Sequence, residues 1–307
     1  MNIKQQNDNI AQEKDTEIKL SNGGVLRVEA ASPHLFRIRL AGDGHFVEPG
    51  VIRYGIFPGA QERCPVRVQK GKGQIRIQTG GAVLEISEVD GAFALYDDRG
   101  KCLVRSACAP QCGTRQGFSA ELVIGPQEKF YGLGDVCRDR LNKRGHKAEM
   151  WVKNVSSYIP IPLVMSTGGW ALLVNSSWKH TIDIGQAHSD RLAFFGEYFD
   201  RGYGNLDFYL IAGENLPLLL DRYTRLTGRP ALLPKWAYGF MFINREYENI
   251  NQVLENGLHF RDRKFPDRAN QGPGSDHRGL QLLLRPLPAN SCSDKPTVPN
   301  DTGETRH

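Results

Sequence analysis

Apolar and polar residues alternate along residues 16–212 of the chain. Phe36, Ile38 and Leu40 alternate with Arg37 and Arg39, and further two-residue periods occur at 66–68, 75–77, 122–124, 170–174 and 206–211. A period of two places every second side chain on the same face of a β-strand. We therefore expect strands with one face on a hydrophobic core and the other face in water.

Glycine-rich turns separate these strands, so the strands are expected to be short. The turns lie at 22–24 (NGG), 71–73 (GKG) and 80–81 (GG), and glycine readily adopts the positive φ that tight turns require. We count about a dozen short strands and no helix pattern over residues 16–212, which predicts an antiparallel β-sandwich and a mainly β protein. We interpret the polar residues 1–15 as a disordered lead-in.

The pattern changes from strand to helix at Gly213. Asn215 is a suitable N-cap, Pro217 lies in the first turn, and Gly228 followed by Pro230 ends the helix. We therefore predict a linker helix within residues 213–233. Its apolar face consists of Leu216, Leu219, Leu220, Tyr223 and Leu226.

The next stretch loses the alternation. Residues 234–243 (PKWAYGFMFI) are nearly all apolar, which is typical of a strand buried on both faces in a parallel sheet. Asn249 and Gln252 then begin a second helix with a capping-box pattern. Residues 234–266 are therefore predicted to form the first strand and helix of an α/β barrel. The predicted buried stripe of this helix is Ile250, Val253, Leu254, Gly257 and Leu258.

The last segment keeps neither period. Residues 267–307 contain five prolines and no aromatic residue. Such a composition cannot bury a core. We interpret these residues as a disordered or out-of-frame tail.

Composition and charge narrow the class of protein only slightly. The net charge of +5 is too small to indicate a nucleic-acid or membrane partner. The six cysteines form no CxxC pair, so we expect no metal site and predict free thiols in a reducing compartment. Residues 1–15 lack the apolar core of a signal peptide. No apolar run approaches the ~20 residues of a membrane span, and we expect a cytoplasmic protein.

Basic residues cluster between positions 138 and 147. Nucleic-acid sites usually interleave aromatic residues with their cations, and this cluster contains no aromatic residue. We therefore interpret it as a solvated hairpin loop. Its members are Arg138, Arg140, Lys143, Arg144, His146 and Lys147.

Several motifs in a fixed order resemble the N-terminal part of glycoside hydrolase family 31, the retaining α-glucosidases and α-xylosidases. These motifs are FYGLGD at 130–135, the Arg144–Gly145 pair, the tryptophan segment 150–154, IPIP at 159–162 and GWALLVN at 169–175. Residues 227–239 (TGRPALLPKWAYG) resemble the element that opens the family's (β/α)8 barrel. The resemblance covers about residues 20–266 and implies a galactose-mutarotase-like sandwich followed by the start of the barrel.

The resemblance also implies a chemistry that this chain does not contain. The family hydrolyses α-glucosides or α-xylosides with two aspartates on later barrel strands and needs no cofactor, and retention requires the carboxylates roughly 5 Å apart. No matching motif occurs here, so we assign no catalytic residue and expect the chain to be inactive. We interpret the carboxylates of the sandwich as solvated turn and strand residues: Asp135, Asp139, Glu149, Glu197, Asp200 and Asp207.

Three residues are candidates for sugar binding. Asn154 occupies the position at which the family's sandwich loop carries a substrate-contacting aspartate, and a turn role is its alternative. Trp151 either stacks on a sugar ring or packs in the core, and packing is the commoner role of a tryptophan. Arg245 follows the first predicted barrel strand, near the expected site face, and a structural salt bridge is its alternative.

Two other functions remain open at this point. A sandwich of this kind also suits a non-catalytic carbohydrate-binding module with an aromatic platform. A mutarotase-like sugar epimerase would need a histidine paired with a carboxylate. The histidines in the second half of the sandwich are His146, His180 and His188, and their spacing singles out none of them.

Overall fold

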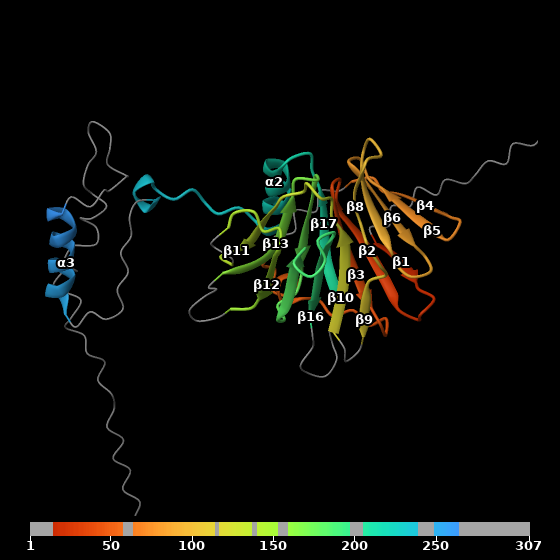
Figure 1. Cartoon of the computed structure of the whole chain (residues 1–307), viewed down its shortest axis with the longest axis horizontal. Coiled ribbons are helices and arrows are strands. Elements are labelled where there is room, and N and C mark those ends of the chain that lie inside the picture. The colour runs from red at the N-terminus through yellow and green to blue at the C-terminus, as the bar shows by residue number, and fades with distance from the viewer. Residues whose placement is uncertain are drawn as a thin grey trace, which may run out of the picture. The chain divides into compact units, whose positions relative to one another are not determined.

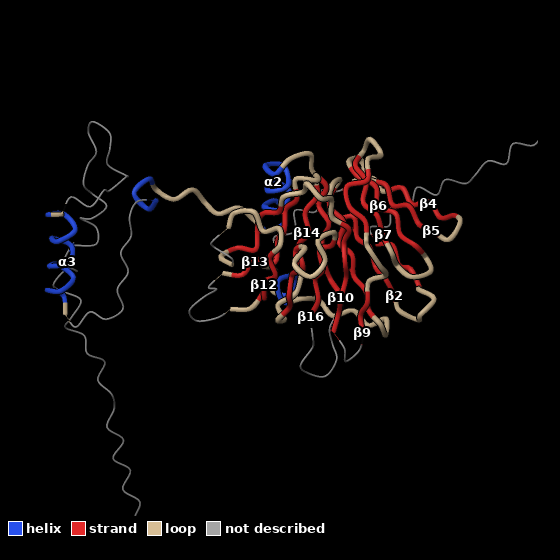
Figure 2. Tube along the Cα trace, viewed as in Figure 1, coloured by secondary structure: helices blue, strands red, loops and turns tan. Residues whose placement is uncertain are grey.

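The computed structural model describes most of the chain and shows a mainly β protein (Figure 1). Strands make up nearly all of the regular structure up to residue 212, and helices follow (Figure 2). The chain divides into two compact units, residues 1–229 and 230–307, and each is described by itself. The described residues are 15–57, 64–113, 117–136, 140–152, 159–196, 205–238 and 249–263.

The first unit contains one large antiparallel sheet. Its central strands are fully buried, because one face packs in the core and the other face is covered by later segments. The seven strands in spatial order are β1 (Asp15–Lys19), β2 (Val25–Ser32), β3 (Leu35–Ala41), β17 (Leu206–Ala212), β14 (Trp170–Val174), β13 (Pro160–Ser166) and β11 (Phe130–Gly134).

Two further antiparallel sheets have five strands each. One is ordered β12 (His146–Met150), β15 (His180–Ile184), β16 (Arg191–Gly196), β10 (Gly117–Val123) and β9 (Gln111–Gly113). The other is ordered β4 (Arg67–Gly71), β5 (Gln74–Gln78), β6 (Ala82–Ser87), β7 (Phe93–Asp97) and β8 (Cys102–Arg105). An isolated bridge between Ser106 and Leu122 links these two sheets.

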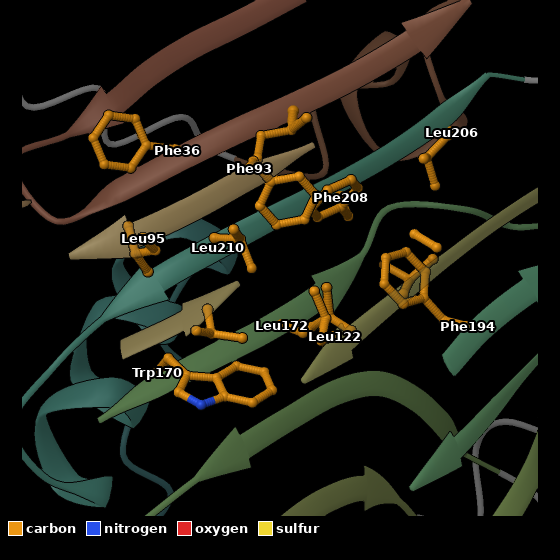
Figure 3. Packing of buried hydrophobic residues seen from close by; sticks show 14 of the residues in the cluster. Phe36, Phe93, Leu95, Leu122, Trp170, Leu172, Phe194, Leu206, Phe208 and Leu210 are labelled. Atoms are coloured by element: carbon orange, nitrogen blue, oxygen red, sulfur yellow. The ribbon is translucent and has the colours of Figure 1, made fainter. Parts of the chain in front are cut away.

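Both five-stranded sheets pack on the same face of the seven-stranded sheet. Phe208 of β17 lies between them, with its ring centroid 5.6 Å from that of Phe93 and 5.2 Å from that of Phe194 (Figure 3). Trp170 packs edge-on against Phe130, and both side chains are fully buried in the core. The predicted antiparallel β-sandwich is therefore confirmed, with a core built from the inward residues of all three sheets.

The opposite, outer face of the seven-stranded sheet is also covered. Helix α2 (Leu216–Thr227) lies against β13 and β17 and buries Leu219 and Leu226. The helix begins as the sequence predicts, since the Asn215 side chain accepts a hydrogen bond from the backbone N–H of Leu218. A short helix, α1 (Gly50–Arg53), interrupts the long connection between β3 and β4.

The outward arginines of β3 are buried, contrary to the prediction from the sequence. Alternation along β3 predicted that Arg37 and Arg39 lie in water, but both side chains are buried. The pattern located the strand and its inward residues Phe36, Ile38 and Leu40 correctly. It gave no signal for the segment that later covers the outward arginines.

The glycines of the FYGLGD motif shape the edge strand β11. A Cβ at Gly132 would overlap the carbonyl oxygen of Leu163 on β13, and φ at Gly132 is 126°, so only glycine fits there. Between these glycines the buried Leu133 also has a positive φ, of 67°, where the pairing with β13 shifts register. The motif thus builds a bulge that turns the chain out of the sheet.

The second unit differs from its predicted structure at the start of the predicted strand. Residues 235–238, the start of the predicted strand, form a 3-10 helix, η1 (Lys235–Tyr238), and 239–248 lie outside the described residues. Helix α3 (Ile250–Asp262) begins at the predicted cap, where the Asn249 side chain accepts from Asn251 and Gln252.

The predicted burial of helix α3 is wrong for two residues of its stripe. Leu254 and Leu258 are exposed, because the described part of this unit provides no apolar surface over them. Cys102 and Cys108 are free thiols, as predicted. No helix in the described part of the chain has the length and apolarity to cross a membrane. Asp15 begins β1, so the predicted disordered lead-in is wrong for this residue, and the rest of the lead-in and the tail lie outside the described residues.

Candidate functional site

Trp151 is the one predicted sugar-binding residue that lies within the described residues. It follows β12, in which Ala148 and Met150 point into the core while Lys147 and Glu149 do not. Trp151, the first residue after the strand, is 47% exposed. The core-packing alternative for this tryptophan is therefore wrong.

Polar and aromatic groups flank Trp151 at this end of the sandwich. Strand β12 pairs antiparallel with β15 as far as Met150 opposite His180, so residues 151 and 179 leave the sheet together. The Nζ atom of Lys179 lies 3.1 Å from Oε1 of Glu149, and Trp178 is also a partly exposed tryptophan. An exposed indole beside charged groups is suited to contacting a ligand with both apolar and hydroxyl surface.

The other two candidates cannot be placed. Asn154 and Arg245 lie outside the described residues, and so do three of the weighed carboxylates, Asp139, Glu197 and Asp200. The roles inferred for these residues from the sequence remain predictions.

Two of the weighed carboxylates, Glu149 and Asp207, form ion pairs with basic side chains. Glu149 is paired with Lys179, and the two oxygens of Asp183 accept from backbone N–H groups of the following turn. Asp207 is buried, and its Oδ2 lies 2.6 Å from Nη2 of Arg37. The interpretation of Asp207 as a solvated residue is therefore wrong.

Asp207 is the centre of a buried ion-pair network that sequence reasoning missed. Arg37 donates to both carboxylate oxygens, Arg39 Nε lies 3.5 Å from Oδ2, and the Asn175 side-chain amide donates to Oδ2 at 3.1 Å. Burial alone would lower the pKa of Arg37, but the hydrogen bond from Arg37 to Asp207 raises it above its usual value. Burial raises the pKa of Asp207, while the hydrogen bond from Arg37 and the charges of Arg37 and Arg39 oppose that rise. The network joins β3 to β17 and to Asn175, which follows β14, so it links neighbouring strands of the seven-stranded sheet.

The described histidines do not provide a mutarotase-like acid–base pair. His180 is buried, and its Nδ1 donates to the carbonyl oxygen of Trp178 at 2.7 Å. Its Nε2 has no hydrogen-bond partner, and burial lowers the pKa of this imidazole. The Nε2 of His146 is likewise buried without a partner, and His188 is exposed. The structure gives no support to the epimerase alternative.

The basic cluster has a structural role in part. The Arg144 guanidinium donates to the backbone carbonyls of Gly125, Glu128 and Ser189, which joins three loops. Lys143 is buried, with Nζ 2.5 Å from the carbonyl oxygen of Arg140. The interpretation of the whole cluster as solvated is therefore wrong for these two residues, while Arg138 lies outside the described residues.

No group of three potential metal ligands comes together in the described ranges. The exposed indole of Trp151 and its polar neighbours are thus the feature of the described surface that best suits ligand binding. They define a sugar-binding candidate without a catalytic pair.

Comparison with known protein families agrees with the sandwich and its motifs. The glycosyl hydrolase 31 N-terminal galactose mutarotase-like domain matches residues 25–183, which is more than half of the chain. The chain therefore belongs to glycoside hydrolase family 31, and its sandwich is the N-terminal domain of that family.

Curated relatives are much longer than this chain. An α-xylosidase from Emericella nidulans is 30% identical over 160 residues, which is 50% of this chain and 20% of that protein. An α-glucosidase from Bacillus thermoamyloliquefaciens is 26% identical over 220 residues, 67% of this chain and 27% of that protein. The chain thus corresponds to about a quarter or less of these enzymes.

Solved structures share the fold. A GH31 dextranase from Flavobacterium johnsoniae, complexed with isomaltotriose, has a TM-score of 0.69 at 22% identity, covering 82% of this chain and 32% of that one. A GH31 α-xylosidase from a soil metagenome, complexed with xylose, has a TM-score of 0.69 at 18% identity, covering 84% and 40%. At these identities the likeness establishes the fold alone.

Proposed function

We propose that this chain is the substrate-recognising N-terminal part of a retaining α-glycosidase that hydrolyses an α-glucoside or an α-xyloside. The family membership supports the reaction class, and relatives named α-xylosidase and α-glucosidase support the two sugars. The catalytic carboxylates belong to the part of such an enzyme that this chain does not match. The 307-residue chain by itself contributes recognition and not cleavage.

The exposed indole of Trp151 is the observation that carries the recognition role. Exposing a tryptophan costs the free energy of its apolar surface in water, and stacking on the apolar face of a sugar ring recovers it. The neighbouring Glu149 and Lys179 supply a charged acceptor and donor for hydroxyl groups. Asn154 and Arg245 are proposed as further sugar contacts on the resemblance alone.

The same observation supports the alternative of a non-catalytic carbohydrate-binding sandwich. Trp151 lies on a sandwich that has a complete core of its own, so sugar binding by this chain needs no further domain. We further propose a domain division into a sandwich at 16–212, a linker helix within 213–233, a barrel segment at 234–266 and a tail at 267–307. The free thiols favour the cytoplasm as its location.

Calorimetric titration of the 307-residue chain with xylose, glucose and isomaltotriose tests the recognition role. We expect saturable binding of at least one of these sugars. Trp151→Ala should weaken that binding about tenfold or more, as expected for loss of an aromatic contact of about 1 kcal/mol or more. Tyr54→Ala is the matched control, since Tyr54 is an exposed aromatic residue on a different connection.

Two outcomes would contradict the recognition role. One is that none of the three sugars binds, and the other is that binding of a sugar is equal in the wild-type chain and the Trp151→Ala variant. Neither result would affect the family membership, which rests on the match over residues 25–183.

A further inference from the structure

Residues 45–57 lie over the outer face of the seven-stranded sheet, and we name this segment the strap. It follows β3 and contains helix α1. Its first residues contact the buried network of Arg37, Arg39 and Asp207, and its last residue, Phe57, packs beside Tyr209 of β17. The strap is therefore fixed to the sheet at its two ends.

Hydrogen bonds fix the first end of the strap. Arg39 donates to the Glu48 carboxylate at 2.6 Å and to the backbone carbonyl of Val47 at 2.8 Å. Arg37 also donates to Glu48, at 3.2 Å. The Asn205 side chain accepts from the N–H of Val47 and donates to the carbonyl of His45. Glu48 is the only one of the strap's groups in this set that carries a charge.

The ring of Phe46 contacts two arginines of like charge beneath the strap. Arg27 of β2 and Arg39 of β3 are directly opposite in the antiparallel register, where like charges repel. The Phe46 ring centroid lies 4.4 Å from the guanidinium carbon of Arg27 and 5.0 Å from that of Arg39. One ring thus provides cation–π contacts to both guanidinium groups.

The middle of the strap has no comparable attachment. Helix α1 contains no buried residue, and Tyr54 and Ile56 are largely exposed. The second end is fixed by apolar packing, with the Phe57 ring centroid 6.4 Å from that of Tyr209. A segment with few buried contacts between two fixed ends is the kind that opens locally, below the free energy of global unfolding.

We propose that the strap opens as a local unit that hinges at its apolar end beside Phe57, and that Glu48 is the latch that keeps it closed across Arg37 and Arg39. Opening lifts Phe46, Val47 and Glu48 together, since these consecutive residues all contact Arg39. It leaves the Arg37–Asp207 pair in place, because that pair joins β3 and β17 without the strap. The sandwich core therefore stays folded when the strap is open.

Hydrogen exchange followed by mass spectrometry on the full 307-residue chain tests the latch. Glu48→Gln keeps the shape of the side chain but removes its charge, and charge-assisted hydrogen bonds are the stronger ones. We expect amide exchange across residues 45–54 to rise about tenfold or more, with exchange in β3 and β17 unchanged. Trypsin cleavage after Arg53 should accelerate in parallel.

A second variant and a control separate the latch from a general loss of stability. Asn205→Ala removes the two side-chain hydrogen bonds to the strap backbone and should accelerate exchange in the same residues. Glu85→Gln removes a carboxylate paired with Arg76 on another sheet and should leave strap exchange unchanged. Unchanged strap exchange in Glu48→Gln would overturn the proposal. So would exchange that rises equally in the strap, β3 and β17, since the strap would then open only with the core.

Discussion

Strands β3 and β5 have the same local pattern but differ in what covers their outward arginines. In β3 Arg37 alternates with Phe36 and Ile38, and its side chain is 6% exposed and paired with the buried Asp207. In β5 Arg76 alternates with Ile75 and Ile77, and its side chain is 43% exposed and paired with Glu85. The inward residues of both strands are equally buried.

The difference shows that an alternating pattern predicts the burial of the inward face of a strand but not whether its outward face is covered. A cation in water needs no partner, whereas a buried cation needs opposite charge and hydrogen bonds to offset its lost hydration. In β3 these come from Asp207 of β17, which is 170 residues from Arg37 in sequence, and from Glu48 of the strap, which is 11 residues from Arg37. The two arginines should therefore differ in their contributions to stability and in their response to pH.

The largest expected effect is the loss of the buried carboxylate. Asp207→Ala leaves Arg37 buried without its bidentate partner, so the free energy of unfolding should fall by about 3–5 kcal/mol. Denaturant titration monitored by tryptophan fluorescence measures this change. A loss below about 1 kcal/mol would mean that the β3 network contributes no more than a surface pair.

Removing the apolar cover over the same face should have a smaller effect. Phe57→Ala deletes the ring that packs beside Tyr209, and because Phe57 is only partly buried we expect a loss of about 2 kcal/mol, below that of a fully buried phenylalanine. The same denaturant titration measures the loss. Full stability of this variant would show that Phe57 does not anchor the outer face.

The pH dependence of the covered face should follow Glu48. Burial alone would raise the pKa of Glu48, but the guanidinium groups of Arg37 and Arg39 lower it below its usual value. A lowered carboxyl pKa stabilises the fold above about pH 4.5, and this contribution is lost as the pH falls through the folded-state value. The difference in unfolding free energy between wild type and Glu48→Gln should therefore be largest near neutral pH and shrink in acid. A difference that is constant from pH 7 to pH 3 would contradict this.

The smallest expected effect is on strand β5, whose outward Arg76 is partly exposed to water. Glu85→Ala removes the partner of Arg76, and since both groups are solvated we expect a change of roughly 0–1 kcal/mol that decreases with added salt. Denaturant titrations at low and high ionic strength measure it. A loss as large as that of Asp207→Ala would remove the contrast between the two strands.

Sequence reasoning succeeded where local physics decides the structure. The period of two located β3, β14 and β17, and the caps at Asn215 and Asn249 marked the two helix starts. These features depend on neighbouring residues, so a single sequence contains the information.

Sequence reasoning failed where distant segments decide the structure. The Asp207 network joins residues 170 positions apart, and no local pattern indicates such a pairing. The exposure of Trp151 depends on where β12 ends at the edge of a sheet, so the sequence left both of its roles open. Residue type alone favoured burial, because most tryptophans are largely buried.

We propose that this chain supplies sugar recognition and architecture but no cleavage. An assay of the purified 307-residue chain with aryl α-glucoside and aryl α-xyloside tests it most directly. We expect no release of the aryl group above that of a mock purification from host cells without the gene. Release clearly above that control, at a rate proportional to the amount of purified chain, would contradict the claim.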